Sequence, residues 1–340
     1  MRTNILVLRF SSIGDIIQTT SVLNTVKKYL PNHFITYLTL TKYEPLLKNH
    51  PSIDALHSID PKKDQAGLKK VNEIFNENPF SLIVDLHNSA RSKFIRRKFS
   101  HIDSVSVKKP RFKRLALFLN HVNSFEKDFN QRSWLHQPIR SLLPVDCEFS
   151  SISLALKAKE ADDALSLLNK YEIFNQKYFA LVPGAAWRNK EWGVEKYIAV
   201  INFCVNKYDL TPVLIGSKED SICFEIEKNI SAPIINLAGQ TDLRESMAII
   251  QRSEYCIGSD TGFTYAAEAF DVPTIAILGP TSIETGAGVR SKNSHSLQVD
   301  NLWCRPCSQN GSFPCYRSKK YCMEEISSEN VISNIVSFLN

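Results

Sequence analysis

The sequence predicts an α/β protein built from two similar halves. Short apolar runs such as residues 5–8 and 34–40 are typical of buried parallel strands, and segments with apolar residues at helical spacing lie between them. This alternation is lost after Pro144 and begins again at residues 179–182. A chain of 340 residues is also longer than a single domain with one hydrophobic core usually is. We therefore expect two nucleotide-fold domains that face each other across a cleft, with the boundary between residues 145 and 175.

The individual elements follow from the apolar spacing and from the Pro and Gly residues that end it. In the first half we expect strands at 5–8, 34–40, 53–59 and 82–86, helices up to residue 29 and at 68–75, 112–121 and 134–143, an edge or crossing strand at 152–156, and a helix at 161–171. In the second half we expect strands at 179–182, 212–215, 234–237, 255–257 and 274–278, and helices at 194–207, 243–252, 263–270 and from 328 onward.

Charge is distributed unevenly along the chain. Residues 1–150 hold 23 Lys and Arg against 13 Asp and Glu, a net of +10, whereas the remainder holds 18 against 22, a net of −4. Between Arg91 and Arg114 there are ten basic residues and a single acid, Asp103. Such a domain is typical of proteins with an anionic partner, which can be nucleic acid, a membrane surface or a phosphorylated acceptor. The stretch lacks the interleaved aromatics of a single-strand platform, so we expect no nucleic-acid partner.

Several protein classes lack support. No apolar run approaches the length of a membrane-spanning helix, and the N-terminal run is too short for a secretory signal. The eight Cys do not require disulfides, so we expect a reducing, cytoplasmic location. Neither a Gly-x-Gly-x-x-Gly after the first strand nor a P-loop occurs, which disfavours dehydrogenases and P-loop enzymes.

The most informative stretch runs from Cys256 to Phe270. It is typical of a buried strand, a tight turn at Ser259–Gly262 and a helix. The first N–H groups of a helix lack intrahelical partners, so this turn can bind an anion such as a diphosphate. The alternative is that Asp260 or Thr261 only caps the helix.

Two further loops carry candidate chemistry. In the loop 11–15, Gly14 permits a close approach or a positive φ, and Asp15 can be a general base facing the cleft or a plain N-cap. In the loop 183–192, Arg188 and Lys190 lie beside two tryptophans and suit a sugar phosphate, with Lys190 as a point charge on a leaving phosphate. The alternative is that the two tryptophans merely anchor a surface loop.

A metal site has mixed support. Cys-x-x-Cys followed by two more cysteines is typical of zinc sites, but a reduced structural loop is the alternative because the last two lack that spacing. These cysteines are Cys304, Cys307, Cys315 and Cys322. No Asp-x-Asp motif occurs that could hold a metal against a diphosphate. We therefore expect no metal and no cofactor at the diphosphate site. The charge of a bound diphosphate must then be neutralised by helix N-termini and by Lys or Arg side chains. We expect His87, His136 and His295 to be structural or exposed.

Together these motifs resemble glycosyltransferase family 9, the lipopolysaccharide heptosyltransferases, over nearly the whole chain. The similar segments are 5–19, 84–91, 183–192, 259–262 and the cysteine loop with the final helix. The resemblance implies a GT-B fold, with two Rossmann-like domains. It divides the chain into an acceptor-binding domain at 1–160, a nucleotide-sugar-binding domain at 161–325 and a C-terminal helix at 326–340 that can pack back on the first domain.

The resemblance also implies an inverting, metal-independent glycosyltransferase. At the family level it moves heptose from ADP-heptose onto a lipopolysaccharide core or related anionic glycan. Asp15 is the implied base and Lys190 the implied contact to the departing diphosphate. The implied donor-binding residues are Ser12, Gly14, Trp187, Arg188, Lys190, Glu219, Asp220, Asp260, Thr261, Gly262 and Tyr265, where Glu219 and Asp220 are alternatives for the ribose contact. The implied acceptor contacts are Arg91, Lys93, Arg96 and Arg97.

Two departures keep alternatives open. Tyr265 stands where the family usually has His, and Gly193 where Pro is common. A phenol cannot supply an imidazolium near neutral pH, so the donor contact or the donor itself can differ. The rival interpretations are a non-catalytic nucleotide-sugar or lipopolysaccharide-binding protein and a family member with another NDP-sugar and acceptor. In either case we expect a cytoplasmic protein that reaches the anionic inner face of the inner membrane.

Overall fold

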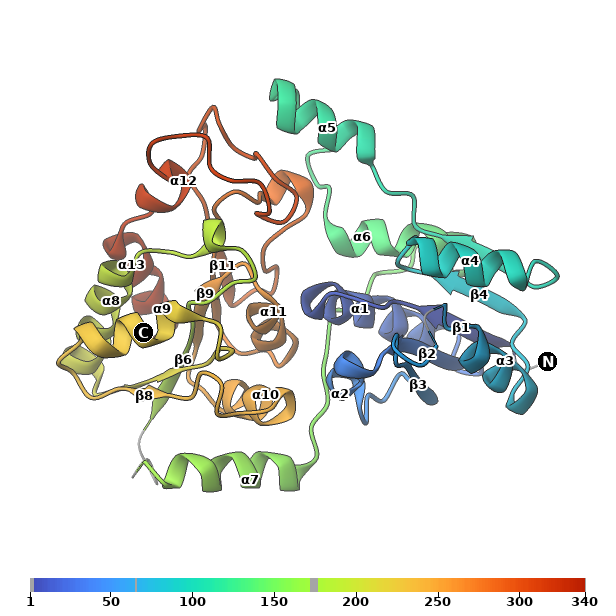
Figure 1. The fold of residues 1–340 in the computed structure, drawn as a ribbon, viewed down its shortest axis with the longest axis horizontal. Helices are drawn as coiled ribbons and strands as arrows, with labels where there is room; N and C mark the ends of the chain where they lie inside the picture. Colours follow the sequence, from blue (N-terminus) through green and yellow to red (C-terminus); the bar gives the residue numbers. More distant parts are fainter. Residues whose placement is uncertain (1–2, 65, 172–176, 340) are drawn as a thin grey trace. The chain divides into compact units, whose positions relative to one another are not determined.

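The computed structural model describes residues 3–64, 66–171 and 177–339 (Figure 1). The chain forms two compact units, each with one sheet. Unit 1 comprises Met1–Pro110 and Gln131–Leu156, and unit 2 comprises Arg111–Asn130 and Lys157–Asn340. The structure confirms the predicted α/β fold with two Rossmann-like halves. Sequence reasoning did not anticipate that residues 111–130 group with the second unit.

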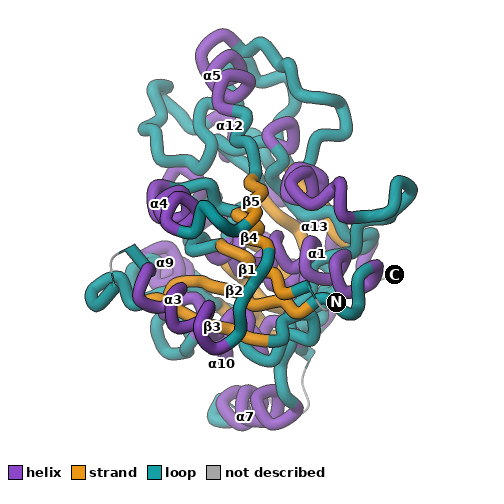
Figure 2. The backbone as a smooth tube through the Cα atoms, turned by 90° about the vertical axis from the view of Figure 1, so that its right-hand side faces the viewer, coloured by secondary structure: helices purple, strands orange, loops and turns teal. Residues whose placement is uncertain are grey.

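The sheet of unit 1 is parallel and lies in view in Figure 2. Its strand order is β3-β2-β1-β4-β5. The chain moves from β1 outward to β3 and then returns to β4 on the other side of β1, so the order reverses between β1 and β4. The elements are β1 (Asn4–Leu8), α1 (Ile13–Tyr29), β2 (Phe34–Leu40), α2 (Glu44–Leu47), β3 (Ala55–Ile59), α3 (Leu68–Glu77), β4 (Leu82–Asp85), α4 (Ala90–Lys98), β5 (Asp103–Ser106) and α6 (Gln131–His136).

The segment expected to be a strand at 152–156 is irregular. Its backbone, with that of the preceding Ser151, is hydrogen-bonded to side chains of α1 and to the His50 ring. The Ser153 N–H donates to Thr20 Oγ1 at 3.0 Å, and Asn24 Nδ2 donates to the Ser151 carbonyl at 2.9 Å. Apolar alternation here reflects packing on a helix, which the sequence pattern alone does not distinguish from an edge strand.

The sheet of unit 2 is also parallel, with the order β11-β10-β9-β6-β7-β8. The order reverses between β6 and β9. The strands are β6 (Tyr178–Val182), β7 (Thr211–Leu214), β8 (Ile235–Asn236), β9 (Cys256–Ser259), β10 (Thr274–Ile277) and β11 (Ser294–Leu297). The helices are α5 (Arg111–Asn120), α7 (Ala158–Asn169), α8 (Val194–Tyr208), α9 (Ser221–Asn229), α10 (Leu243–Gln251), α11 (Gly262–Ala269), α12 (Tyr321–Glu324) and α13 (Ser328–Leu339).

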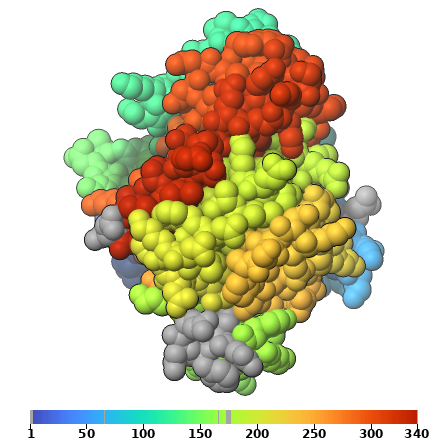
Figure 3. All heavy atoms as spheres, turned by 90° about the vertical axis from the view of Figure 1, so that its left-hand side faces the viewer, coloured from blue at the N-terminus to red at the C-terminus, as the bar shows by residue number. Residues whose placement is uncertain are grey.

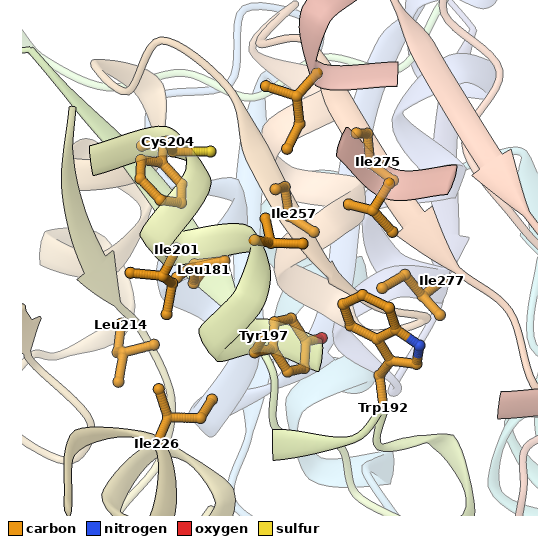
Figure 4. Close-up of a cluster of buried hydrophobic side chains, with 14 of the residues drawn as sticks. Leu181, Trp192, Tyr197, Ile201, Cys204, Leu214, Ile226, Ile257, Ile275 and Ile277 are labelled. Carbon is orange, nitrogen blue, oxygen red and sulfur yellow. The ribbon is translucent and has the colours of Figure 1, made fainter. Parts of the chain in front are cut away.

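The core of unit 2 lies between its central strands and α8. Figure 4 shows Leu181 and Ile257 of the strands facing Ile201 of α8. Helix α13 adds the fully buried Val331 and Ile335 to the same core. The expectation that the final helix also packs back on the first domain stays a prediction. Within the described residues, no helix combines the length and apolar character needed to cross a membrane.

Candidate active site

The predicted site loops follow the central strands of the two sheets. In open α/β sheets, ligands bind outside the carboxyl ends of the strands where the strand order reverses. In unit 1 these ends are followed by residues 9–12 after β1 and 86–89 after β4. In unit 2 they are followed by residues 183–193 after β6 and 260–261 after β9. We call the two loops of each unit the half-site of that unit.

The half-site of unit 2 is organised around a buried ion pair. Lys190 Nζ lies 2.8 Å from Asp260 Oδ2, and the two side chains are 13% and 8% exposed. Thr281 Oγ1 donates to the same carboxylate oxygen at 2.9 Å, and the Tyr265 hydroxyl donates to the other at 2.9 Å. A lysine and a carboxylate far apart in sequence thus meet beside the helix that follows β9.

The electrostatics fix the protonation states of this cluster. Burial acts to raise the pKa of Asp260, but the charge and hydrogen bond of Lys190, with the hydrogen bonds from Tyr265 and Thr281, outweigh it and lower the pKa. Burial and the neighbouring carboxylate raise the pKa of Tyr265 well above its ordinary value. Tyr265 therefore stays a hydrogen-bond donor, and Asp260 stays charged.

Helix α11 begins directly after this pair. Thr261 is the N-cap of this helix and Asp260 is not. The alternative interpretation, that the residue only caps the helix, is therefore right about the position of Thr261 and wrong for Asp260. The first amides of α11, from Gly262 onward, have no partner within the helix and form the positive end of its dipole. This helix end and the Lys190 ammonium are adjacent, because Asp260 joins them. The arrangement suits a diphosphate.

The loop that carries Lys190 is held by the cysteine loop. Asn189 Nδ2 donates to the Phe313 carbonyl at 2.6 Å. Gly311, at φ +81°, lies so close that a Cβ there would be 2.7 Å from Cγ of Lys190. Trp192 is buried in the core and donates to the Ile326 carbonyl at 3.0 Å, so the anchoring interpretation is right for this tryptophan.

Other predicted donor contacts lie at the edge of this half-site. Trp187 is 45% exposed. Arg188 Nη2 donates to Ser221 Oγ at 3.1 Å. Asp220 Oδ2 accepts the Ser217 N–H at 2.6 Å, whereas Glu219 is exposed. Asp220 thus holds its own loop together, and Glu219 extends into solvent.

The cysteines of residues 304–322 are free thiols. Burial and the neighbouring thiols raise the pKa of Cys322 to about 12, and they raise the pKa of Cys307. Thiols with raised pKa values stay protonated at neutral pH. Across residues 3–64, 66–171 and 177–339, no group of three or more His, Cys, Asp or Glu side chains is arranged to hold a metal ion.

The half-site of unit 1 is organised around Asp15. This residue is the third of α1 and Ser12 is the N-cap, so the interpretation of Asp15 as an N-cap is wrong. Arg9 Nη2 lies 2.7 Å from Asp15 Oδ2, which also accepts from the Ser12 N–H at 3.1 Å and the Ser12 hydroxyl at 2.9 Å. Gln131 Nε2 donates to Oδ1 at 2.7 Å. Gly14 is buried in the first turn and is helical, so it does not need a positive φ.

Asp15 is held as a carboxylate. Burial acts to raise its pKa, but the Arg9 guanidinium and the hydrogen bonds from Ser12 and Gln131 lower it to about 2. The side chain is still 35% exposed, so a substrate hydroxyl can approach it. Arg9 itself is buried, and it donates to the Leu86 carbonyl at 2.6 Å.

Sequence reasoning missed Arg9, Gln131 and Thr281, and it expected His87 to be structural or exposed. Arg9 directly follows a buried apolar strand, and that position was the only available signal. His87 Nδ1 accepts the Phe10 N–H at 3.0 Å, which places the ring in the same loop region. Burial and the charge of Arg9 lower the pKa of His87 to about 4, so the ring is neutral at pH 7.

The four predicted acceptor contacts separate into three environments. The guanidinium of Arg91 lies over the Phe10 ring, 5.3 Å from its centre, at the half-site. Arg96 Nε lies 3.1 Å from the buried carboxylate of Asp85 and holds α4 to the end of β4. Lys93 and Arg97 are exposed on α4.

The sequence matches the profile of glycosyltransferase family 9 (heptosyltransferase) over residues 69–316, which is more than half of the chain. The chain belongs to glycosyltransferase family 9. The enzyme is 25% identical to lipopolysaccharide heptosyltransferase 1 of Campylobacter coli, with 82% of this chain and 84% of that protein covered. It is 27% identical to lipopolysaccharide heptosyltransferase 3 of Escherichia coli, with 79% and 81% covered.

Solved structures agree on the fold of this family 9 enzyme. A family 9 glycosyl transferase from Veillonella parvula has a TM-score of 0.80 at 18% identity, covering 99% of this chain and 97% of that one. The E. coli heptosyltransferase WaaC with ADP has a TM-score of 0.67 at 13% identity, covering 99% and 100%. The predicted GT-B fold and the prediction of a glycosyltransferase are both confirmed.

The departure at Tyr265 leads to a prediction about stability. Its hydroxyl donates to Asp260 and accepts the Gly288 N–H at 3.0 Å. Tyr265→Phe leaves that N–H unsatisfied in the interior, so we expect the free energy of unfolding to fall by about 1–3 kcal/mol. Urea denaturation measures this. The matched control is Tyr171→Phe, an exposed tyrosine whose hydroxyl donates to Gln240 at 3.0 Å. Equal small effects of both variants would contradict the assigned role.

Proposed function

We propose that this family 9 enzyme transfers heptose from ADP-heptose, with inversion and without a metal, to a lipopolysaccharide core or related anionic glycan. The observation that carries the proposal is the Lys190–Asp260 pair beside the N-terminus of α11, at the point where the strand order of unit 2 reverses. Relatives named as lipopolysaccharide heptosyltransferases over most of their length support the substrates. The solved structure of heptosyltransferase WaaC with ADP supports the adenine nucleotide of the donor.

Lys190 and α11 act on the leaving group. The Lys190 ammonium has three N–H donors and uses one on Asp260, which leaves two for phosphate oxygens. The amides at Gly262 add fixed dipoles. As the bond from the anomeric carbon to the diphosphate breaks, its electron pair leaves with ADP, and these groups stabilise the growing negative charge. No metal is needed in this scheme, because cationic and dipolar groups already neutralise the diphosphate.

Asp15 accepts the proton. The acceptor hydroxyl attacks the anomeric carbon from the face opposite the diphosphate and transfers its proton to Asp15 Oδ1. A carboxylate with a pKa near 2 is a weak base toward a free hydroxyl. It can take the proton once the new C–O bond has made the hydroxyl acidic, so we place the proton transfer late in the step. Arg9 then keeps the carboxylate charged and oriented between turnovers.

The basic surface of unit 1 supports an anionic acceptor. Arg91 at the half-site and the exposed Lys93 and Arg97 on α4 can meet acceptor phosphates. Arg96 is the weakest candidate for an acceptor contact because its guanidinium already forms an ion pair with Asp85. For the donor, we assign the ribose contact to Glu219, because Asp220 is hydrogen-bonded within its own loop. We place the enzyme in the cytoplasm at the inner face of the inner membrane, where such an acceptor is exposed.

A donor panel tests this proposal. The enzyme is incubated with a lipopolysaccharide core acceptor and with ADP-heptose or other nucleoside diphosphate sugars, each with and without EDTA. We expect turnover with ADP-heptose, an inverted anomeric centre by NMR, and no loss of rate in EDTA. Loss of turnover in EDTA that added Mg²⁺ restores would overturn the metal-free scheme. A clear preference for another sugar would favour the second candidate, a family member with a different donor, which Tyr265 makes chemically reasonable.

A further inference from the structure

Helix α5 presents an apolar face to solvent. Phe112, Leu115 and Leu119 recur at helical spacing and are 89%, 53% and 68% exposed. Exposed apolar residues are common one at a time, but three on one face of a helix are not. The opposite side is anchored, because Leu117 is only 4% exposed. The apolar face is thus a surface of a folded helix, without a partner among the described residues.

A second apolar segment adjoins α5 in the same unit. The rings of Trp303 and Tyr316 are 57% and 61% exposed and lie 6.2 Å apart. The His121 ring, directly after α5, lies 6.5 Å from the Trp303 ring. Figure 3 shows the orange-to-red residues of this loop at one end of unit 2, next to blue-green residues of α5. We call α5 and the segment 303–317 together the apolar rim.

The charged residues within the two segments of the apolar rim are all basic, and acids flank these segments at Asp300, Glu126 and Glu324. Residues 111–125 contain no acid and residues 301–323 contain none either. The basic residues in these two segments are Arg111, Lys113, Arg114, Arg305, Arg317, Lys319 and Lys320. Arg317 lies over the Trp303 ring at 4.5 Å. Apolar residues on one face with Lys and Arg beside them are typical of helices that lie in a membrane interface, where Trp and Tyr are also enriched.

We propose that the apolar rim docks onto the surface of an anionic phospholipid bilayer, with Phe112, Leu115, Leu119 and Trp303 inserted below the headgroups. A second copy of the chain is disfavoured, because a self-complementary contact would bring like charges together. A protein partner in place of the bilayer would appear in the test as a wild-type chain that does not bind vesicles. The proposal rests on the proposed function in one respect, since it explains how the enzyme reaches an acceptor that is anchored in lipid.

Vesicle flotation tests the docking directly. The full chain is mixed with vesicles of phosphatidylethanolamine and phosphatidylglycerol, or of phosphatidylcholine alone. We expect binding to the anionic vesicles only, and a loss of roughly tenfold or more in Phe112→Ser/Leu115→Ser/Leu119→Ser. The matched control is Val145→Ser/Phe224→Ser, at 82% and 44% exposed, which should bind as the wild type does.

Two further measurements test the role of basic side chains in vesicle binding and the depth to which Trp303 is inserted. Lys113→Glu should weaken binding by about fivefold or more, because each basic residue near an anionic surface contributes roughly that factor. Lys177→Glu, 73% exposed in the same unit, is its control. In a Trp187→Phe background, Trp303 is the exposed tryptophan, because Trp134 and Trp192 are buried. Its emission should shift to the blue on anionic vesicles and should be quenched by brominated lipid.

The outcomes separate docking from catalysis. Calorimetry with ADP should give equal affinities for the wild type and the triple variant, which shows that unit 2 is folded. Absence of vesicle binding by the wild type, or unchanged binding by the triple variant, overturns the proposal whatever the turnover. A wild-type dimer by light scattering that the triple variant converts to a monomer, without vesicle binding, also overturns it. If the wild type binds anionic vesicles but glycosylates no acceptor, the docking proposal stands and only the proposed function is overturned.

Discussion

Asp15→Asn is expected to lower the rate of sugar transfer by about 10³-fold, because an amide cannot accept the proton of the acceptor hydroxyl. Asparagine keeps the size of the side chain, but its single carbonyl oxygen can accept from Gln131 or from Ser12, which donate to different oxygens of Asp15. The change removes the charge that Arg9 faces at 2.7 Å. We expect the affinity for ADP to stay unchanged, since the diphosphate contacts that we propose at Lys190 and Gly262 lie in unit 2. Rates from a coupled ADP-release assay, with calorimetry for ADP, check both expectations.

The control for Asp15 is Asp54→Asn in the same unit. Asp54 pairs with Lys27 at 2.6 Å and is 24% exposed, so its variant loses a comparable ion pair away from the half-site. It should retain the wild-type rate. If Asp15→Asn also turns over at nearly the wild-type rate, the base lies elsewhere. His87 would be the next residue to replace, because it is neutral and lies in the same loop region.

Lys190→Met is expected to lower both the affinity for ADP and the transfer rate, the latter by about 10²- to 10³-fold, as for the loss of a group that stabilises a developing charge. Methionine keeps most of the stem that packs against Gly311 and removes the ammonium. Calorimetry measures the affinity, and single-turnover kinetics measure the chemical step. A larger effect on the rate than on the affinity is expected, because the charge on the diphosphate grows in the transition state.

Lys190→Met also leaves the Asp260 carboxylate buried without its cation, so the variant can lose stability as well as function. Lys190→Met/Asp260→Asn removes that penalty and should restore the midpoint of thermal unfolding without restoring the rate. The control Lys177→Met removes an exposed lysine 3.6 Å from Glu254. Full ADP affinity in the folded double variant would show that Lys190 does not contact the diphosphate.

The central elements were predictable because their physics is local. Central strands buried on both faces are continuous apolar runs, as at β1 and β6, and the Asp-Thr-Gly turn marks a helix start by its composition. The edge strands β5 and β11 were missed because they are short and polar, with the sequences DSVS and SHSL. A strand of this kind is specified by its neighbour rather than by its own residues.

The candidate site was only half predictable for a related reason. The sequence identifies Lys190 and Asp260 separately, but the 2.8 Å contact between them depends on two strands that are distant in sequence and neighbours in the sheet. The same holds for Arg9 and Gln131 on Asp15. A spacing pattern cannot show which oxygen each donor reaches, and those donors decide that the pKa of Asp15 falls instead of rising with burial.

The phenol beside the donor lysine has a consequence for how the enzyme responds to acidity. The pKa of Asp260 is lowered and that of Tyr265 is raised, so neither group changes its proton count between mildly acidic and mildly alkaline solution. A histidine at that position would gain a charge near the lysine as a cell acidifies. With tyrosine at this position, the net charge of the Lys190–Asp260–Tyr265 cluster in the proposed nucleotide-binding unit stays the same when the pH changes in this range.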